Sequence, residues 1–235
     1  MTEQERIVEL IKRLRGLYPD AKCSLDFTNA LELLVATILA GQCTDERVNQ
    51  VGKTLFKKYR TAQDYTAVPL QELETDLKQI TFYRNKAKHI QEACTILVNR
   101  YGGEVPKNMR DLLSLPGVAR KTANVVLGNA YGIVEGVIVD THAGRISQRL
   151  GLVNSSDPVQ IEQVLMRKLP RADWLDYTHM LIYHGRAVCK APKPLCNQCT
   201  LVDLCPTGTA FLANPAPAAQ STPKLKAAKA SKATK

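Results

Sequence analysis

A tight bend between two helical segments constrains the fold of this chain more than any other feature. Pro116 and Gly117 interrupt the helical pattern of residues 110–114, because proline lacks a backbone N–H and glycine tolerates a positive φ. A second helix is predicted to begin almost at once. Its apolar contacts are Ala123, Val125, Val126 and Leu127. The pattern therefore predicts a helix–hairpin–helix unit.

Lys121 falls in the first turn of this second helix. Backbone N–H groups at the bend and at the start of the helix lack helical partners and can bind an anion. A cation is disfavoured there by the positive end of the helix dipole, so its placement needs a reason. At this level two alternatives stay open: a functional lysine in an anion-binding hairpin, or a solvated lysine beside an ordinary bend.

Apolar residues recur at helical spacing along most of the chain, and no alternating strand pattern competes with them. The only extended run is 136–139, which leads to Asp140. The predicted class is therefore all-α. Besides the hairpin, helices are expected at 7–18, 30–40, 45–56, 63–67, 70–79, 84–101, 141–150, 158–169 and 174–188.

The net charge of +10 suits a polyanionic partner but does not prove one. Five of these charges are lysines in the segment from Pro206 onward, which has no acidic residue, so +5 remains for the rest. The composition from 207 to 235 predicts a disordered basic tail. The nearly apolar run 30–40 is too short to span a bilayer, and the polar N-terminus does not resemble a signal peptide. A soluble, intracellular protein is expected.

Four of the seven cysteines lie in one short segment with the spacing C-x₆-C-x₂-C-x₅-C: Cys189, Cys196, Cys199 and Cys205. Such crowding in an intracellular protein favours a metal over disulfides. The spacing favours a [4Fe–4S] cluster, and a single zinc ion stays open as the alternative. The loop 190–195 carries Lys190 and Lys193, which suit either a phosphate contact or a solvated loop.

Several motifs, in this order, resemble the endonuclease III family of helix–hairpin–helix DNA glycosylases with a [4Fe–4S] cluster. The likeness rests on residues 115–118 with 121–124, on 139–142, on the cysteine pattern, and on 42–45, 83–87, 103–106 and 184–186. It covers most of the chain up to Cys205. The chain departs from the family pattern at Ala119 and Thr81, where glycine is common, and at Ala143-Gly144.

The resemblance implies two helical lobes that flank a DNA-binding cleft: residues 22–133 form one, and 1–21 with 134–206 form the other. Lys121 matches the family's Schiff-base lysine and Asp140 its essential aspartate. Gln42 matches the residue that fills the space of the extruded base, and Phe82 stands where an apolar wedge is expected. The other predicted DNA contacts are Asp45, Leu115, Gly117, Val118, Ala119, Arg120, His142, Lys190 and Lys193.

The activity implied is that of a bifunctional DNA glycosylase/AP lyase, which removes oxidised pyrimidines through a lysine imine and cleaves the strand by β-elimination. The helix N-terminus and Arg120 are expected to favour the neutral amine that this chemistry needs. The expected partner is double-stranded DNA with damaged bases or abasic sites. A cytoplasmic, nucleoid-associated monomer is expected. The alternatives are an adenine mismatch glycosylase of the same fold and a non-catalytic helix–hairpin–helix DNA-binding module.

Overall fold

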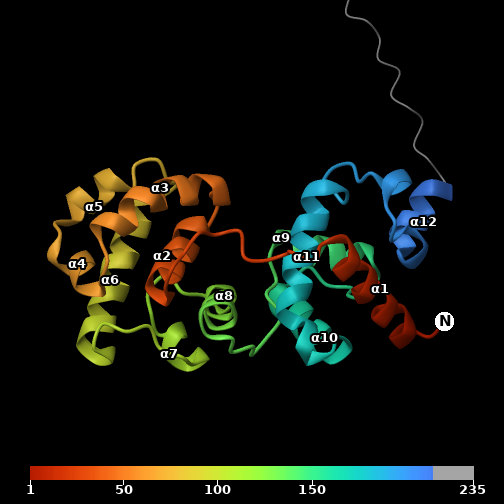
Figure 1. Ribbon diagram of the computed structural model, residues 1–235, viewed down its shortest axis with the longest axis horizontal. Helices are drawn as coiled ribbons and strands as arrows, with labels where there is room; N and C mark the ends of the chain where they lie inside the picture. Colours follow the sequence, from red (N-terminus) through yellow and green to blue (C-terminus); the bar gives the residue numbers. More distant parts are fainter. Residues whose placement is uncertain (214–235) are drawn as a thin grey trace, which may run out of the picture.

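The computed structural model describes residues 1–213, and this part of the chain is helical without any β-strand (Figure 1). The predicted all-α class is confirmed. Residues 214–235, which belong to the predicted basic tail, lie outside the described residues. The helices are α1 (Glu3–Leu17), α2 (Ala30–Ala40), α3 (Asp45–Lys58), α4 (Ala62–Ala67), α5 (Leu70–Asp76), α6 (Tyr83–Tyr101), α7 (Met109–Leu113), α8 (Arg120–Tyr131), α9 (Thr141–Arg149), α10 (Pro158–Lys168), α11 (Trp174–Ala187) and α12 (Pro206–Ala213).

Helix ends follow the local chemistry of the sequence. Asn29 and Thr44 cap α2 and α3, and each accepts a hydrogen bond from a first-turn backbone N–H. Gly102 ends α6 in the left-handed conformation, with a φ of 62°. These capping groups satisfy backbone atoms that the helices themselves leave unpaired. The helix starts expected at residues 30 and 45 and the helix end expected at residue 101 are therefore confirmed.

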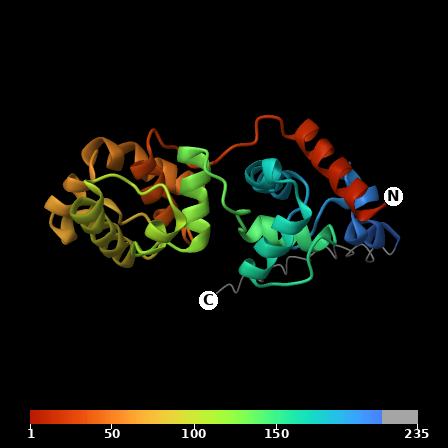
Figure 2. The same cartoon turned by 90° about the horizontal axis from the view of Figure 1, so that it is seen from below.

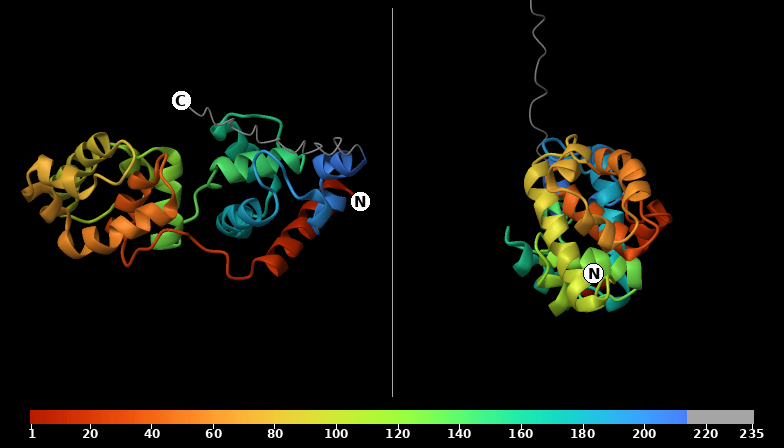
Figure 3. Two further views of the ribbon diagram at one scale, coloured as in Figure 1. Left: turned by 90° about the horizontal axis from the view of Figure 1, so that it is seen from above. Right: turned by 90° about the vertical axis from the view of Figure 1, so that its left-hand side faces the viewer.

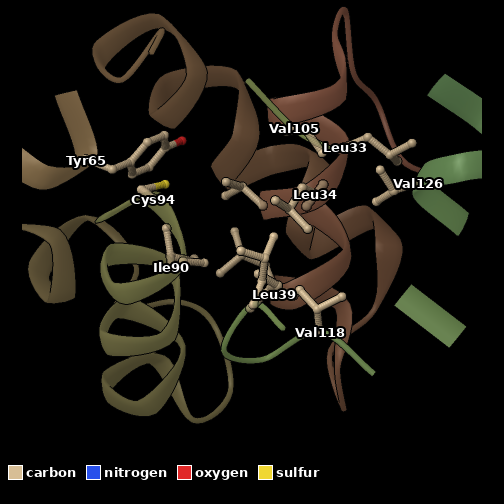
Figure 4. Packing of buried hydrophobic residues seen from close by; sticks show 14 of the residues in the cluster. Leu33, Leu34, Leu39, Tyr65, Ile90, Cys94, Val105, Val118 and Val126 are labelled. Atoms are coloured by element: carbon tan, nitrogen blue, oxygen red, sulfur yellow. The ribbon is translucent and has the colours of Figure 1, made fainter. Parts of the chain in front are cut away.

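The first hydrophobic core is built around α2, whose residues 33–39 are all buried. Its side chains pack against α3, α6 and α8. Leu33, Leu34 and Leu39 belong to the same buried cluster as Ile90 of α6 and Val126 of α8 (Figure 4). A helix that is apolar nearly all round needs such complete enclosure.

The second hydrophobic core joins the N-terminal helix α1 to the helices that follow Asp140. Apolar residues of α1 pack with those of α9, α10, α11 and the cysteine segment. In Figures 2 and 3, α1 lies beside the C-terminal helices, and two single segments connect this half to the other. One is the stretch between α1 and α2, and the other precedes α9.

The connection before α9 belongs to both cores. Val137 is buried in the second core, and its neighbour Ile138 is buried in the first. Successive side chains of an extended segment point in opposite directions, so one short run can serve two cores. The hydroxyl of Thr178 on α11 donates to the carbonyl of Ile138 at 2.7 Å. Within residues 1–213, no helix is both long and apolar enough to cross a membrane.

The prediction that a disordered tail begins at residue 207 is wrong, because residues 206–213 form α12. The sequence segment has a tail-like composition, but neighbouring cysteine-loop residues hold it in place. The Gly208 N–H donates to Cys205 Sγ at 3.3 Å. A Cβ at Gly208 would lie 3.1 Å from the Val202 side chain, so α12 packs closely on the segment before it.

Removing α12 should therefore lower stability. A chain that ends at Cys205 is expected to melt at least about 3 °C below a chain that ends at Ala213, because a loss of about 1 kcal/mol lowers Tm by about 2–4 °C at this size. Differential scanning calorimetry of the two chains measures this. Equal melting temperatures would contradict the packing role of α12.

Candidate active site

Lys121 and Asp140 line one pocket at the junction of the two cores. Lys121 comes from the first turn of α8, in the first core, and its side chain is exposed. Within residues 1–213 its amine has no ion pair and no hydrogen bond. Asp45, Thr178 and His179 line the same pocket. The chain therefore presents an unpaired amine at a junction lined with polar groups.

Asp140 caps α9. Its Oδ1 accepts a hydrogen bond from the Ala143 N–H at 2.7 Å. Its other carboxylate oxygen has no hydrogen-bond partner within residues 1–213. A structural cap and a chemical role are therefore compatible in one side chain, because each uses a different oxygen. The cap also fixes the direction of the carboxylate, since Oδ1 is tied to the backbone.

The hairpin between α7 and α8 uses its residues in different ways. Gly117 has a φ of 77°, and a Cβ there would lie 3.1 Å from that of His89, so glycine is required. Ala119 is extended, with φ −89° and ψ 171°, so alanine replaces the family's usual glycine without backbone strain. Leu115 and Val118 are buried, and a hydrogen bond from the Val118 N–H to the Leu115 carbonyl closes the turn.

The anion-binding capacity of the hairpin therefore rests on other amides. The N–H groups of Gly117 and Ala119 have no partner within residues 1–213, nor do those of residues 120–122 at the start of α8. The predicted phosphate contacts at Leu115 and Val118 stay predictions, and their side chains serve the first core.

Arg120 is held by a buried carboxylate of the second core. Its Nε donates to Glu162 Oε2 at 2.7 Å, and Asn124 Nδ2 donates to Glu162 Oε1 at 2.9 Å. Glu162 lies on α10 and is 5% exposed. A Cβ at Gly136 would lie 1.9 Å from Glu162 Oε1, so glycine is required for this approach. The Glu162 carboxylate compensates the charge of Arg120. The expected effect of Arg120 on the Lys121 amine is therefore weaker.

A second ion pair joins the two cores at Asp45. Arg186 at the end of α11 donates through Nη2 to Asp45 Oδ2 at 2.7 Å and through Nη1 to Ser24 Oγ at 3.1 Å. Asp45 is the first residue of α3 and lines the pocket. The Asp45 carboxylate therefore has a cationic partner within the chain. The predicted DNA contact at Asp45 stays a prediction.

His142 lies where α9 packs on α11. Burial lowers the pKa of His142, while the nearby Asp140 carboxylate opposes that shift. A Cβ at Gly185 would lie 2.3 Å from His142 Nδ1, so the close approach of the two helices requires glycine. Arg145 Nη2 lies 3.3 Å from His142 Nδ1 and donates to the Cys189 carbonyl at 3.0 Å. Arg145 therefore connects His142 to the backbone of the cysteine segment.

Gln42 and Phe82 share an unusual backbone conformation. Within residues 1–213 they are the only non-glycine residues with positive φ, at 54° and 57°. Both side chains are exposed, Phe82 to 60%. A left-handed φ is strained for such residues and concentrates at functional positions. Thr81, where the family commonly has glycine, does not adopt this conformation.

All four predicted metal ligands, Cys189, Cys196, Cys199 and Cys205, line a single cavity and form no disulfide. Arg149 Nη1 donates to Cys189 Sγ at 3.2 Å. Within residues 1–213, no three His, Cys, Asp or Glu side chains lie close enough to hold one metal ion. The structure therefore brings the four predicted ligands to one cavity.

The loop that carries Lys190 and Lys193 is tied to α9. Arg149 donates to the carbonyls of Lys190 and Ala191 at 2.8 and 2.6 Å. Both lysine side chains are exposed, and no ion pair holds either of them within residues 1–213. The loop therefore presents two cations to solvent from a backbone that is held in place.

No motif in the sequence pointed to His179. It lies on α11 and is buried, and its Nε2 pairs with Asn129 Oδ1 at 2.9 Å. Asn129 Nδ2 donates to the Val125 carbonyl, so the amide oxygen must face the histidine. His179 Nε2 therefore carries a proton. Burial lowers the pKa of His179, which keeps the ring neutral near pH 7.

Comparison with known proteins decides the family. Residues 35–171 match the model of the HhH-GPD superfamily base excision DNA repair proteins. The chain is 52% identical to endonuclease III of Synechocystis sp. over 209 residues, covering 89% of this chain and 95% of that protein. The chain is a member of the endonuclease III family. Endonuclease III of Bacillus subtilis is 47% identical, with coverage of 88% and 95%.

Solved structures of endonuclease III share the fold. A trapped covalent intermediate of endonuclease III with DNA matches with a TM-score of 0.85 and 46% identity, covering 90% of this chain and 99% of that one. A non-covalent endonuclease III–DNA complex matches with the same TM-score at 45% identity, with coverage of 91% and 100%. The resemblance seen in the sequence motifs is therefore confirmed at the level of family and fold.

The Glu162 contact should contribute measurably to stability. Glu162→Ala leaves Arg120 and the buried Asn124 amide without their acceptor and is expected to lower the free energy of unfolding by about 2–3 kcal/mol. Urea denaturation measures the change. Glu9→Ala, which removes an exposed partner of Arg13 on α1, is the control and should have little effect. Equal stability of the two variants would contradict the role of Glu162.

Proposed function

We propose that this chain is a bifunctional DNA glycosylase/AP lyase of base excision repair, with Lys121 as the nucleophile. The observation that carries the proposal is the unpaired Lys121 amine in a pocket that it shares with Asp140. Family membership supports the same activity, as does the likeness to a trapped endonuclease III–DNA covalent intermediate. The proposed substrates are oxidised pyrimidines and abasic sites in double-stranded DNA.

A base inside a duplex is out of reach, so the enzyme must turn the nucleotide out into the pocket. The proposed wedge is Phe82, and Gln42 would fill the space that the base leaves. Unstacking costs a few kcal/mol per step, which phosphate contacts offset. The hairpin amides at Gly117 and Ala119 and the cations of Lys190 and Lys193 are proposed to make those contacts, without reading sequence.

The neutral Lys121 amine forms a bond to C1′ as the glycosidic bond breaks, and the electron pair leaves with the base, which gains a proton. The first product keeps the sugar ring closed, with C1′ bonded to both the lysine nitrogen and O4′, and the nitrogen loses a proton. The C1′–O4′ bond then breaks as O4′ takes up a proton, which opens the ring and leaves an iminium ion between C1′ and the lysine. Loss of a C2′ proton then expels the 3′-phosphate oxygen, and water releases Lys121 by hydrolysis. Asp140 is proposed to stabilise the positive charge that develops on the sugar and to assist proton transfer.

The two alternatives are less well supported. As the resemblance implies, the adenine mismatch glycosylases lack a lysine at the position of Lys121. A non-catalytic DNA-binding hairpin needs neither an unpaired amine nor a carboxylate in the same pocket. Borohydride reduction on an abasic-site duplex distinguishes the proposed activity from both alternatives, because only a lysine imine is reduced to a stable crosslink.

The proposed cofactor is a [4Fe–4S] cluster held by the four cysteines. The cavity they line, together with donors such as Arg149 and the Gly208 N–H aimed at sulfur, suits thiolate ligands. When bound, the cluster would hold residues 189–205 in one folded loop. The chain's own Arg149 keeps the lysine-bearing loop against α9. We also propose the two lobes as 22–133 and 1–21 with 134–206.

Lys121→Gln tests the nucleophile. Base release and borohydride crosslinking should fall at least about 10³-fold, because the covalent step is lost. Affinity for an abasic-site analogue should change less than about threefold, since one exposed cation contributes little to binding. Lys58→Gln, which alters an exposed ion pair of α3, is the control. Equal losses of binding and chemistry would instead make Lys121 a phosphate contact.

The lysine loop should affect the salt dependence of binding. In Lys190→Ala/Lys193→Ala, the slope of log K against log salt should decrease in magnitude by about 1.8, which corresponds to two lost phosphate contacts. Fluorescence anisotropy over a salt series measures the slope. Lys12→Ala on α1 should leave it unchanged. An unchanged slope in the double variant would show that the loop does not contact DNA.

The metal content follows from the cysteine site. Purified protein should contain iron and acid-labile sulfide in equal amounts, about four of each per chain. Cys199→Ala should lose both and unfold at a lower temperature. Stoichiometric zinc without sulfide would overturn the cluster and favour a single-ion site.

A further inference from the structure

Lys86 is a buried cation to which the proposed chemistry gives no role. It lies on α6 and is 7% exposed. Its Nζ donates to the carbonyls of Leu39 at 2.8 Å and of Gly41 at 2.5 Å. No carboxylate pairs with it within residues 1–213, and burial lowers the pKa of Lys86. A buried ammonium costs free energy unless its hydrogen bonds compensate, so this placement needs an explanation.

One partner of Lys86 is the C-terminal end of α2. This helix has no basic residue in its last turn, and its final carbonyls have no helical partner. Lys86 supplies the missing cation from a different helix, which favours the negative end of the helix dipole. The Ala40 carbonyl accepts from the Cys43 N–H at 3.1 Å. The backbone on both sides of Gln42 is thereby held in place.

The other partner of Lys86 is the start of its own helix. Phe82 is the N-cap of α6, and no side chain caps this end. The Lys86 N–H donates to the Phe82 carbonyl at 3.2 Å. One residue therefore binds the carbonyl of Phe82 through its backbone and the carbonyl of Gly41 through its side chain. Gly41 directly precedes Gln42, so Lys86 connects the two strained, exposed positions of the chain.

We propose that Lys86 is a positioning residue that fixes the separation of Gln42 and Phe82 before DNA binds. The inference rests on the proposed function, because these two side chains are the proposed insertion residues. Holding both strained residues in place in the free protein removes an ordering cost that binding would otherwise carry. Lys86 thereby acts on the opening of the duplex and not on the covalent step at Lys121.

The test compares Lys86→Met with Lys86→Arg, which keeps donors for the two carbonyls, and with Lys58→Met as the control. Two readouts are used: fluorescence of 2-aminopurine next to a tetrahydrofuran abasic analogue in duplex DNA, and single-turnover excision from a duplex. Lys86→Met should lose most of the fluorescence rise and at least about tenfold in duplex excision. Lys86→Arg should recover most of both, and Lys58→Met should match the unmodified chain.

A third readout separates positioning from loss of structure. Borohydride crosslinking to a single-stranded abasic site needs no duplex opening, so Lys86→Met should change it less than about twofold. Equal losses on single strand and duplex would overturn the proposal in favour of a purely structural role. Unchanged fluorescence and duplex excision in Lys86→Met would also overturn it.

A double-variant cycle covers the case in which Lys86→Met does not fold, with Lys86→Gln in its place. If Lys86 acts through the insertion residues, its substitution should add little to the loss already caused by Gln42→Ala with Phe82→Ala. Fully additive losses would contradict the proposal.

Crosslinking by the unmodified chain is the separate control: if that crosslink is absent, the proposed function fails, while the fluorescence readout still tests Lys86.

Discussion

The buried carboxylate of Glu162 determines how the two cores of this chain meet. It accepts from Arg120 and Asn124 on α8 while it belongs to α10, and Gly136 leaves the room that it needs. Lys121 follows Arg120 directly, whereas Asp140 caps a helix of the second core. The amine and the carboxylate therefore share a pocket only because contacts across the junction hold the cores together. The Asp45–Arg186 ion pair and the His179–Asn129 hydrogen bond are further contacts of this kind.

Strain and burial costs are concentrated at a few positions outside the two hydrophobic cores. Gln42 and Phe82 adopt a conformation that side chains disfavour, and Lys86 carries a charge into a buried site between them. Hydrogen bonds to the end of α2 offset part of that cost. The conformational strain and the cost of burying a charge therefore fall at the loops proposed to enter DNA. The interior of each core consists of ordinary apolar packing.

Local signals predicted much of the fold. The helix starts expected at 30 and 45 and the helix end expected at 101 are confirmed, because the caps Asn29, Thr44 and Gly102 each act within one turn. The hairpin and the four cysteines were equally visible as short motifs. Pairings over long distances were not predictable: Arg120 meets Glu162 from 42 positions away, and Lys86 reaches Leu39 from 47. The helix at 206–213 was missed because packing, not composition, orders it.

The most direct test of Lys121 as the nucleophile is to locate the covalent bond. Protein reduced with borohydride on an abasic-site duplex is digested with protease and nuclease, and the adduct is mapped by tandem mass spectrometry. We expect a single sugar-modified peptide with the adduct on the ε-nitrogen of Lys121. An adduct on another lysine or on the N-terminal amine would contradict it, because the junction pocket would then not be where the chemistry occurs.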